Sequence, residues 1–128
     1  MHKAAMISGT LFAGSAVLLG AFGAHALKEK LGTDQLQIFE TAVRYQMYHA
    51  IALLLLGISV DKLNSQLAGI SVWLFVTGII LFSGSLILLA CKTLAGIEHW
   101  KFLGPVTPLG GLCFIGGWIL FLFAYLKK

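Results

Sequence analysis

The chain has 128 residues, of which 59% are hydrophobic and 11% are charged, and its mean hydropathy is +0.92. Soluble domains carry roughly 25% charged residues, so this composition excludes a water-soluble monomer and indicates an integral membrane protein. The net charge of +4 comes from nine Lys and Arg residues scattered along the chain, which argues against nucleic acid as a partner.

The first apolar segment covers residues 4–27 and is long enough for one bilayer crossing, which takes about 20 helical residues. Lys3 before it and the small-x-small sequence Ala24-His25-Ala26 near its end also fit a signal peptide. We favour a transmembrane helix, because the apolar stretch exceeds the roughly 7 to 15 residues of a signal-peptide core.

The second segment begins near Thr33 as an amphipathic helix. Leu36, Phe39 and Val43 recur at steps of three and four residues, which is the spacing of one helix face. We therefore expect the first turns to lie at the membrane interface and the span to cover residues 42–60.

Two further spans follow, over residues 67–90 and 109–126. The short polar turn before the third span predicts an antiparallel hairpin with the second. The sequence Gly104-Pro105-Val106-Thr107-Pro108 after the next polar loop predicts a structured approach to the fourth span, which would begin at Leu109.

The expected fold class is therefore all-α, with residues 1–128 forming one transmembrane domain, a compact four-helix bundle. Four antiparallel spans place both termini on one side of the bilayer. The expected side of the termini carries four basic residues and the other side five, so the charges do not decide the orientation and dual topology stays open.

Small residues in the spans predict close helix packing, because the hydrophobic effect supplies no drive between helices in lipid. The expected packing glycines are Gly9, Gly20, Gly23, Gly84, Gly110 and Gly111. These contacts fit either a single chain or a homo-oligomer.

Helix direction brings the polar residues of all four spans toward one side of the membrane. The candidates for binding a ligand or lipid are His25, Glu40, Arg44, Tyr45, Gln46, His49, Ser83, Ser85 and Thr107. We expect them to form a polar pocket open to one interface. An arginine at this depth is costly, so Arg44 should pair with Glu40 one turn earlier or extend to the interface.

These residues also have structural interpretations. Glu40 and Arg44 fit an interfacial ion pair within an aromatic belt, and His49 fits a hydrogen bond to a neighbouring helix. His25 and His49 suggest a metal site or proton relay, but no third ligand has a suitable spacing, so neither a metal nor another cofactor is expected. The two cysteines are interpreted as small hydrophobic residues.

Four sequence blocks occur together in the order known from one family. They are GAFGAH at residues 20–25, TAVRYQMYHA at 41–50, FSGS at 82–85 and GPVTPLGG at 104–111. In these blocks the chain resembles the YgdD-like family of small uncharacterised inner-membrane proteins, which has relatives in eukaryotes. The resemblance implies a multi-pass protein of a bacterial-type plasma membrane, with both termini in the cytoplasm and no established activity.

Three functional hypotheses follow. The leading one is a non-enzymatic bundle that binds a lipid headgroup, a small ligand or a partner protein near Arg44 and His49. The second is an oligomeric transporter or channel subunit with a path along His25, His49, Thr77 and Ser83, which requires polar residues through to the opposite side. The third is a membrane enzyme with His49 as general base, although no nucleophile or metal set is recognisable and no catalytic residue is assigned.

Overall fold

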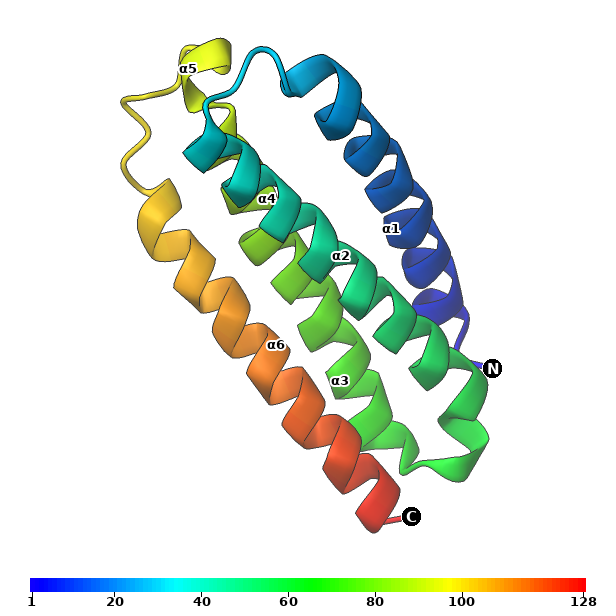
Figure 1. The fold of residues 1–128 in the computed structure, drawn as a ribbon. Helices are drawn as coiled ribbons and strands as arrows, with labels where there is room; N and C mark the ends of the chain where they lie inside the picture. Colours follow the sequence, from blue (N-terminus) through cyan, green and yellow to red (C-terminus); the bar gives the residue numbers. More distant parts are fainter.

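The computed structural model describes residues 1–128, and all of its elements are helical (Figure 1). The α-helices are α1 (Lys3–Phe22), α2 (Thr33–Ser59), α3 (Ser65–Gly78), α4 (Gly84–Ala90), α5 (Lys92–Ala95) and α6 (Leu103–Leu126). Two π-helical turns continue α1 and join α3 to α4, and a 3₁₀ turn ends α2; these are η1 (Gly23–Leu27), η3 (Ile79–Ser83) and η2 (Val60–Lys62). The expected all-α fold class is confirmed.

Four continuous helical segments are long and apolar enough to cross a membrane. They are Lys3–Leu27, Thr33–Lys62, Ser65–Ala90 and Leu103–Leu126. Large apolar side chains cover their outer surfaces, and Leu18, for example, is 73% exposed. Such a surface is unfavourable in water but is solvated by acyl chains, so the chain is a multi-pass membrane protein.

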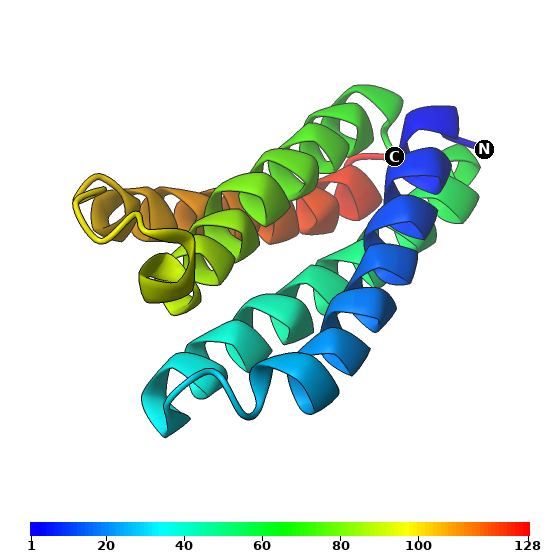
Figure 2. The same ribbon diagram turned by 90° about the horizontal axis from the view of Figure 1, so that it is seen from above.

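The helices associate as two antiparallel pairs, α1 with α2 and α3 with α6 (Figures 1 and 2). The second pair meets the first mainly where α4 and η3 contact α2. Both termini lie at the same end of the bundle, here called the termini end. There the His2 amide donates to the Gly57 carbonyl at 3.0 Å, and the Asn64 amide donates to the Ala124 carbonyl at 2.8 Å.

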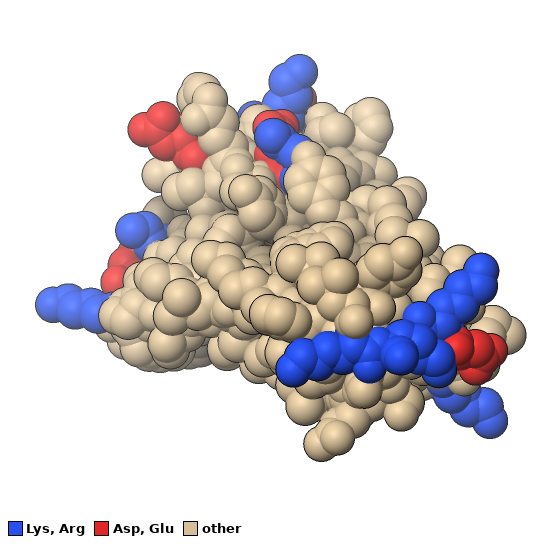
Figure 3. All heavy atoms as spheres, turned by 90° about the horizontal axis from the view of Figure 1, so that it is seen from below, with Lys and Arg blue, Asp and Glu red and all other residues tan.

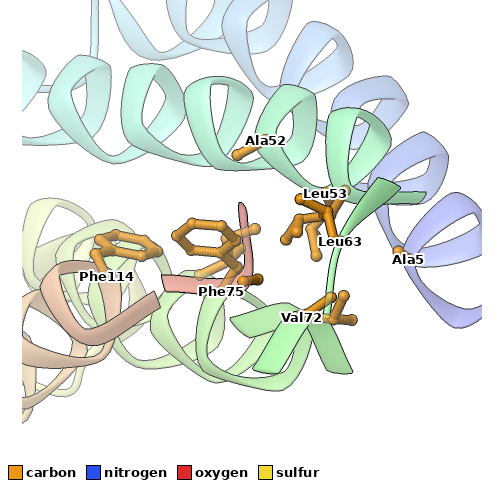
Figure 4. Close-up of a cluster of buried hydrophobic side chains, with 11 residues drawn as sticks. Ala5, Ala52, Leu53, Leu63, Val72, Phe75 and Phe114 are labelled. Carbon is orange, nitrogen blue, oxygen red and sulfur yellow. The ribbon is translucent and has the colours of Figure 1, made fainter. Parts of the chain in front are cut away.

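The core at the termini end is apolar. Leu53 and Leu56 of α2 are fully buried against Val72 and Phe75 of α3 (Figure 4). The only buried polar side chain of α3 is Ser71, whose hydroxyl donates to the Gly117 carbonyl of α6 at 2.8 Å. The core of this half of the bundle is thus formed largely by side-chain packing.

Glycines permit the close approach of α6 to α3 and η3. A Cβ atom on Gly117 would lie 2.6 Å from the ring of Phe75, and one on Gly110 would collide with the backbone of Phe82. A Cβ atom on Gly84, in contrast, would meet nothing within 4 Å. The helices of this pair therefore touch through backbone at Gly110, as small residues in membrane helices allow.

The helix of the last span begins before Leu109, where the span itself was expected to begin. Helix α6 starts at Leu103, so the segment with Pro105 and Pro108 is helical and does not precede the helix. Pro105 lies in the first turn, where no amide donor is needed. Pro108 leaves only the Gly104 carbonyl without its helical donor, and Gly104 is exposed.

Charged residues are confined to the two ends of the bundle. Viewed from below, the middle of the surface is uncharged; one group of blue lysine and arginine side chains lies at one corner, and further blue and red side chains lie along other edges (Figure 3). The termini end carries Lys3, Lys62, Lys127 and Lys128 against the single acidic side chain of Asp61. The opposite end, here called the loop end, carries the remaining five basic and four acidic residues.

Candidate functional site

Helix α2 supplies most of the candidate residues, and they point toward different neighbours. Successive residues of an α-helix differ by about 100° in direction, so residues 44, 45, 46 and 49 occupy three faces. Arg44 and Tyr45 are exposed, whereas Gln46 and His49 are each 5% exposed. The expected polar pocket is therefore divided into separate local contacts.

Gln46 connects α2 to α1. Its Nε2 atom donates to the Phe12 carbonyl at 3.0 Å and to the Ser15 hydroxyl at 2.7 Å. Both hydrogens of the amide nitrogen are thereby used. Since an unpaired amide in hydrocarbon is costly, this contact stabilises the α1–α2 pair and leaves Gln46 without a free donor for a ligand.

His49 connects α2 to α6. Its Nδ1 atom lies 2.8 Å from the Tyr45 carbonyl one turn earlier, and its Nε2 atom accepts a hydrogen bond from Trp118 Nε1 at 3.0 Å. The ring also stacks on Phe114 with centroids 3.6 Å apart and planes 8° apart. A neutral imidazole with its proton on Nδ1 satisfies both contacts, so neither nitrogen is free to act as a base.

The serines join helices at two further points. Ser83 of η3 donates to the Ala42 carbonyl of α2 at 2.8 Å. Ser85 of α4 shares a hydrogen bond with Thr107 of α6 at 2.5 Å. All three hydroxyls are thus engaged between helices.

Arg44 differs from these residues because the chain leaves it nearly free. Its Nη2 atom lies 3.8 Å from Glu40 Oε2, too far for a hydrogen bond, and the two side chains are 61% and 54% exposed. Exposed pairs of this kind contribute little to stability. The five N–H donors of the guanidinium remain available to another acceptor.

The depth of Arg44 follows from the length of its helix. A hydrocarbon core of about 30 Å takes about 20 helical residues at about 1.5 Å each. Thr33–Lys62 contains 30 residues, so roughly ten of them lie outside the hydrocarbon. If Lys62 marks one interface, the other lies near residue 42. Arg44 then sits within about one turn of the headgroups at the loop end.

A cavity of about 240 Å³ lies between α1 and α2 beside Arg44. We call it the Arg44 groove; its lining residues are Gly20, Gly23, Ala24, Phe39, Glu40, Val43 and Arg44. Gly20 of α1 leaves space in it, since a Cβ atom there would make only ordinary contact with Val43 at 3.7 Å. At Gly23 of η1 the ring of Phe39 fills the corresponding space, 2.6 Å from where a Cβ atom would lie. The result is an apolar floor with a cation and an anion at its edge.

A second cavity, of about 330 Å³, lies on the other flank of α2, between α2 and α6. We call it the aromatic groove; its lining residues are Tyr45, His49, Phe82, Gly111, Phe114, Ile115 and Trp118. The Tyr45 ring packs on Phe82 with centroids 4.9 Å apart. The groove is apolar, and the hydrogen bonds of His49 hold its wall in place.

The remaining candidates lie apart from these grooves. His25 of η1 and Thr77 of α3 are exposed, so no path along His25, His49, Thr77 and Ser83 is assembled. No group of three or more His, Cys, Asp and Glu residues could hold a metal ion. At the end of α4, partial burial raises the pKa of the Cys91 thiol and so disfavours its reactive thiolate.

Two contributors were not among the candidate residues, namely Trp118 and Phe114 of α6. Both contact His49, 65 or more residues earlier in the chain, so no local spacing indicates the contact. One signal was present, because an indole N–H within an apolar span needs an acceptor. His49 was the natural partner at a similar depth.

Comparison with known proteins places the chain in a family. The family model described as "Protein of unknown function (DUF423)" matches residues 19–111. This range includes every residue that lines the Arg44 groove. Of the residues that line the aromatic groove, it includes Tyr45, His49, Phe82 and Gly111.

Related proteins match over almost their whole length. A UPF0382 membrane protein of Staphylococcus aureus is 43% identical over 98% of this chain and 97% of its own. The UPF0382 membrane protein YwdK of Bacillus subtilis is 42% identical over 98% of each chain. No solved structure matches this fold significantly.

Proposed function

We propose that this chain, which belongs to the family described as "Protein of unknown function (DUF423)", is a non-enzymatic membrane protein that binds an anionic lipid at the Arg44 groove. The observation that carries the proposal is the state of Arg44. It is a cation near the hydrocarbon boundary with no hydrogen bond from its own chain, and it stands at the edge of an apolar cavity.

The energetics favour an anionic partner. Placing arginine within the hydrocarbon costs a few kcal/mol on insertion scales, and Glu40 at 3.8 Å offsets this only weakly. A phosphate can accept two parallel hydrogen bonds from a guanidinium, and such charge-assisted bonds are about twice as strong as neutral ones.

Lipid binding is favoured over the two alternatives by specific contacts. An enzyme with His49 as base would need a free ring nitrogen, and both nitrogens are hydrogen-bonded. A transport path would have to continue through the termini end, where Leu53, Leu56 and Phe75 are fully buried.

The test is retention of phosphatidylglycerol by the purified protein, measured by native mass spectrometry. Arg44→Gln should lower the affinity for phosphatidylglycerol at least about tenfold, the equivalent of one charge-assisted hydrogen bond. Lys92→Gln, which removes a cation of the same end outside the groove, is the matched control. Equal retention by both variants and by wild type would contradict the proposal.

A further inference from the structure

We infer that two copies of this chain pair in the membrane through one outer face of α3, η3 and α4, with the Thr77 hydroxyl groups of the two copies hydrogen-bonded to each other. We call this surface the Thr77 face; its residues are Ile70, Trp73, Thr77, Ile80, Gly84 and Leu88. None of them lines the Arg44 groove, so the inference stands independently of the proposed lipid site.

The Thr77 face has no neighbour within its own chain. Its residues follow at steps of three and four, which keeps them on one side of the helical segment. Trp73 and Ile80 are 59% and 58% exposed, and no helix covers the side of α3 that is turned away from α6 and α2 (Figure 2). Gly84 was expected to pack closely, yet a Cβ atom there would meet nothing within 4 Å. The surface is therefore open to another molecule.

Two polar side chains on this face lack hydrogen bonds. Of the polar side chains of α3, only Ser71 forms one, to the Gly117 carbonyl. The Thr77 hydroxyl and the indole N–H of Trp73 therefore have no partner. Exposure alone is not the reason, because Thr10 on the outer surface of α1 donates to the Met6 carbonyl at 2.8 Å.

Thr77 also lies at the depth where a partner is hardest to find. Ser65–Ala90 contains 26 residues, and Thr77 is at the midpoint of this span. Acyl chains have no hydrogen-bonding group, and water is absent from the middle of the bilayer. Threonine side chains in such positions form hydrogen bonds across helix interfaces. The missing partner of Thr77 is thus a group on another protein surface.

A second copy of the chain supplies that group. A hydroxyl both donates and accepts, so two Thr77 side chains satisfy each other. Copies with the same orientation are related by a twofold axis along the membrane normal, which places each Thr77 opposite the other at the same depth. The open space at Gly84 lets the helices approach, and the exposed bulk of Trp73 and Ile80 becomes covered.

The first experiment measures pairing of the full-length protein in phosphatidylcholine vesicles. Energy transfer between donor-labelled and acceptor-labelled copies is followed over a range of protein-to-lipid ratios. Thr77→Val removes the hydroxyl at nearly constant volume, and Thr77→Ser retains it. Thr10→Val is the matched control, because it removes an exposed hydroxyl that is already bonded to its own helix.

Energy transfer in the wild type should rise with the protein-to-lipid ratio. Thr77→Val should weaken the association about threefold, as expected for one hydrogen bond between membrane helices, and Thr77→Ser and Thr10→Val should not weaken it. A wild type that stays monomeric at every ratio would overturn the inference. Unchanged association in Thr77→Val would overturn it as well, because the hydroxyl pair would then not be formed.

A bulky side chain tests the close approach of the two copies. Gly84→Leu should weaken the association at least about tenfold, because the leucine would hold the helices apart. Gly14→Leu is the matched control on α1, since a Cβ atom at Gly14 also meets nothing within 4 Å. Equal association of the two variants would overturn the inference.

Disulfide crosslinking locates the contact in the membrane. The two free cysteines, Cys91 and Cys113, are first replaced by alanine. On oxidation Ile80→Cys should crosslink into dimers. Leu112→Cys of α6 should not, although Leu112 is 64% exposed and, like Ile80, lies on the loop-end side of the middle of its span. Crosslinking of Leu112→Cys as strong as that of Ile80→Cys would overturn the inference.

Discussion

Arg44 and His49 are five residues apart on one helix, yet their surroundings differ completely. Both ring nitrogens of His49 are hydrogen-bonded and its face is covered by Phe114. Arg44 has a single weak contact with Glu40. The unsatisfied cation, and not the buried histidine, is therefore the residue that invites a ligand.

The hydrogen bond between Trp118 and His49 should stabilise the bundle by a measurable amount. Trp118→Phe removes the donor and His49→Phe removes the acceptor, so the double-mutant cycle isolates the pair. We expect a coupling free energy of about 0.6 kcal/mol, the average for such contacts in membrane proteins. Unfolding in mixed micelles measures it, with Trp73→Phe as control, and a coupling of zero would show that the pair is not formed.

For individual residues, the sequence indicated which polar side chains lie within the membrane, but not which residues they form hydrogen bonds with. Gln46 and His49 look equivalent in an apolar helix. Their difference in direction sends one to Ser15 of α1 and the other to Trp118 of α6. Which helix lies on which side of α2 is a property of tertiary packing, and no spacing within the segment encodes it.

Helix α6 shows how far the elements themselves could be predicted. Its apolar length identified a span, since about 20 apolar residues suit a bilayer. The helix begins six residues before the expected start of the span, and it includes Pro105 and Pro108, which were interpreted as a structured entry to the span. Proline in the first turn is compatible with a helix, and the exposed Gly104 carbonyl tolerates the loss of one donor.

The packing of α6 predicts contrasting effects of two glycine substitutions. Gly110→Ala should lower the melting temperature in detergent, because its Cβ atom would collide with the Phe82 backbone, and overpacking of this kind costs about 1–3 kcal/mol. Gly84→Ala should leave the melting temperature unchanged or raise it, since its Cβ atom meets open space and alanine favours the helix. Equal melting temperatures would mean that α6 and η3 are not in backbone contact.

For the whole molecule, the sequence predicted the fold class well but not the arrangement of the helices within the bundle. Composition alone indicated a membrane protein, and the four spans led to a helical bundle. A single polar pocket was expected from helix directions. The pairing of α1 with α2 and of α3 with α6 instead distributes the polar side chains among separate interfaces and leaves two apolar grooves beside α2.

The family resemblance, and not the charge count, predicts an orientation. Four basic residues lie at the termini end and five at the loop end, and acidic residues count little in this bias. The resemblance implies that both termini are cytoplasmic. Reporter fusions at the N- and C-terminus should both give the cytoplasmic signal, and opposite signals would contradict the antiparallel four-span arrangement.

Contact between Arg44 and a lipid phosphate can be tested directly, because Arg44 is the only arginine of the chain. Protein with ¹⁵N-labelled arginine is placed in bilayers of a phosphorus-free glycolipid doped with phosphatidylglycerol, and solid-state NMR measures dephasing of the guanidinium signal by ³¹P. We predict strong dephasing, as expected for a phosphate oxygen about 2.8 Å from a guanidinium nitrogen. A guanidinium signal that ³¹P leaves unaffected would show that Arg44 does not hold a lipid phosphate.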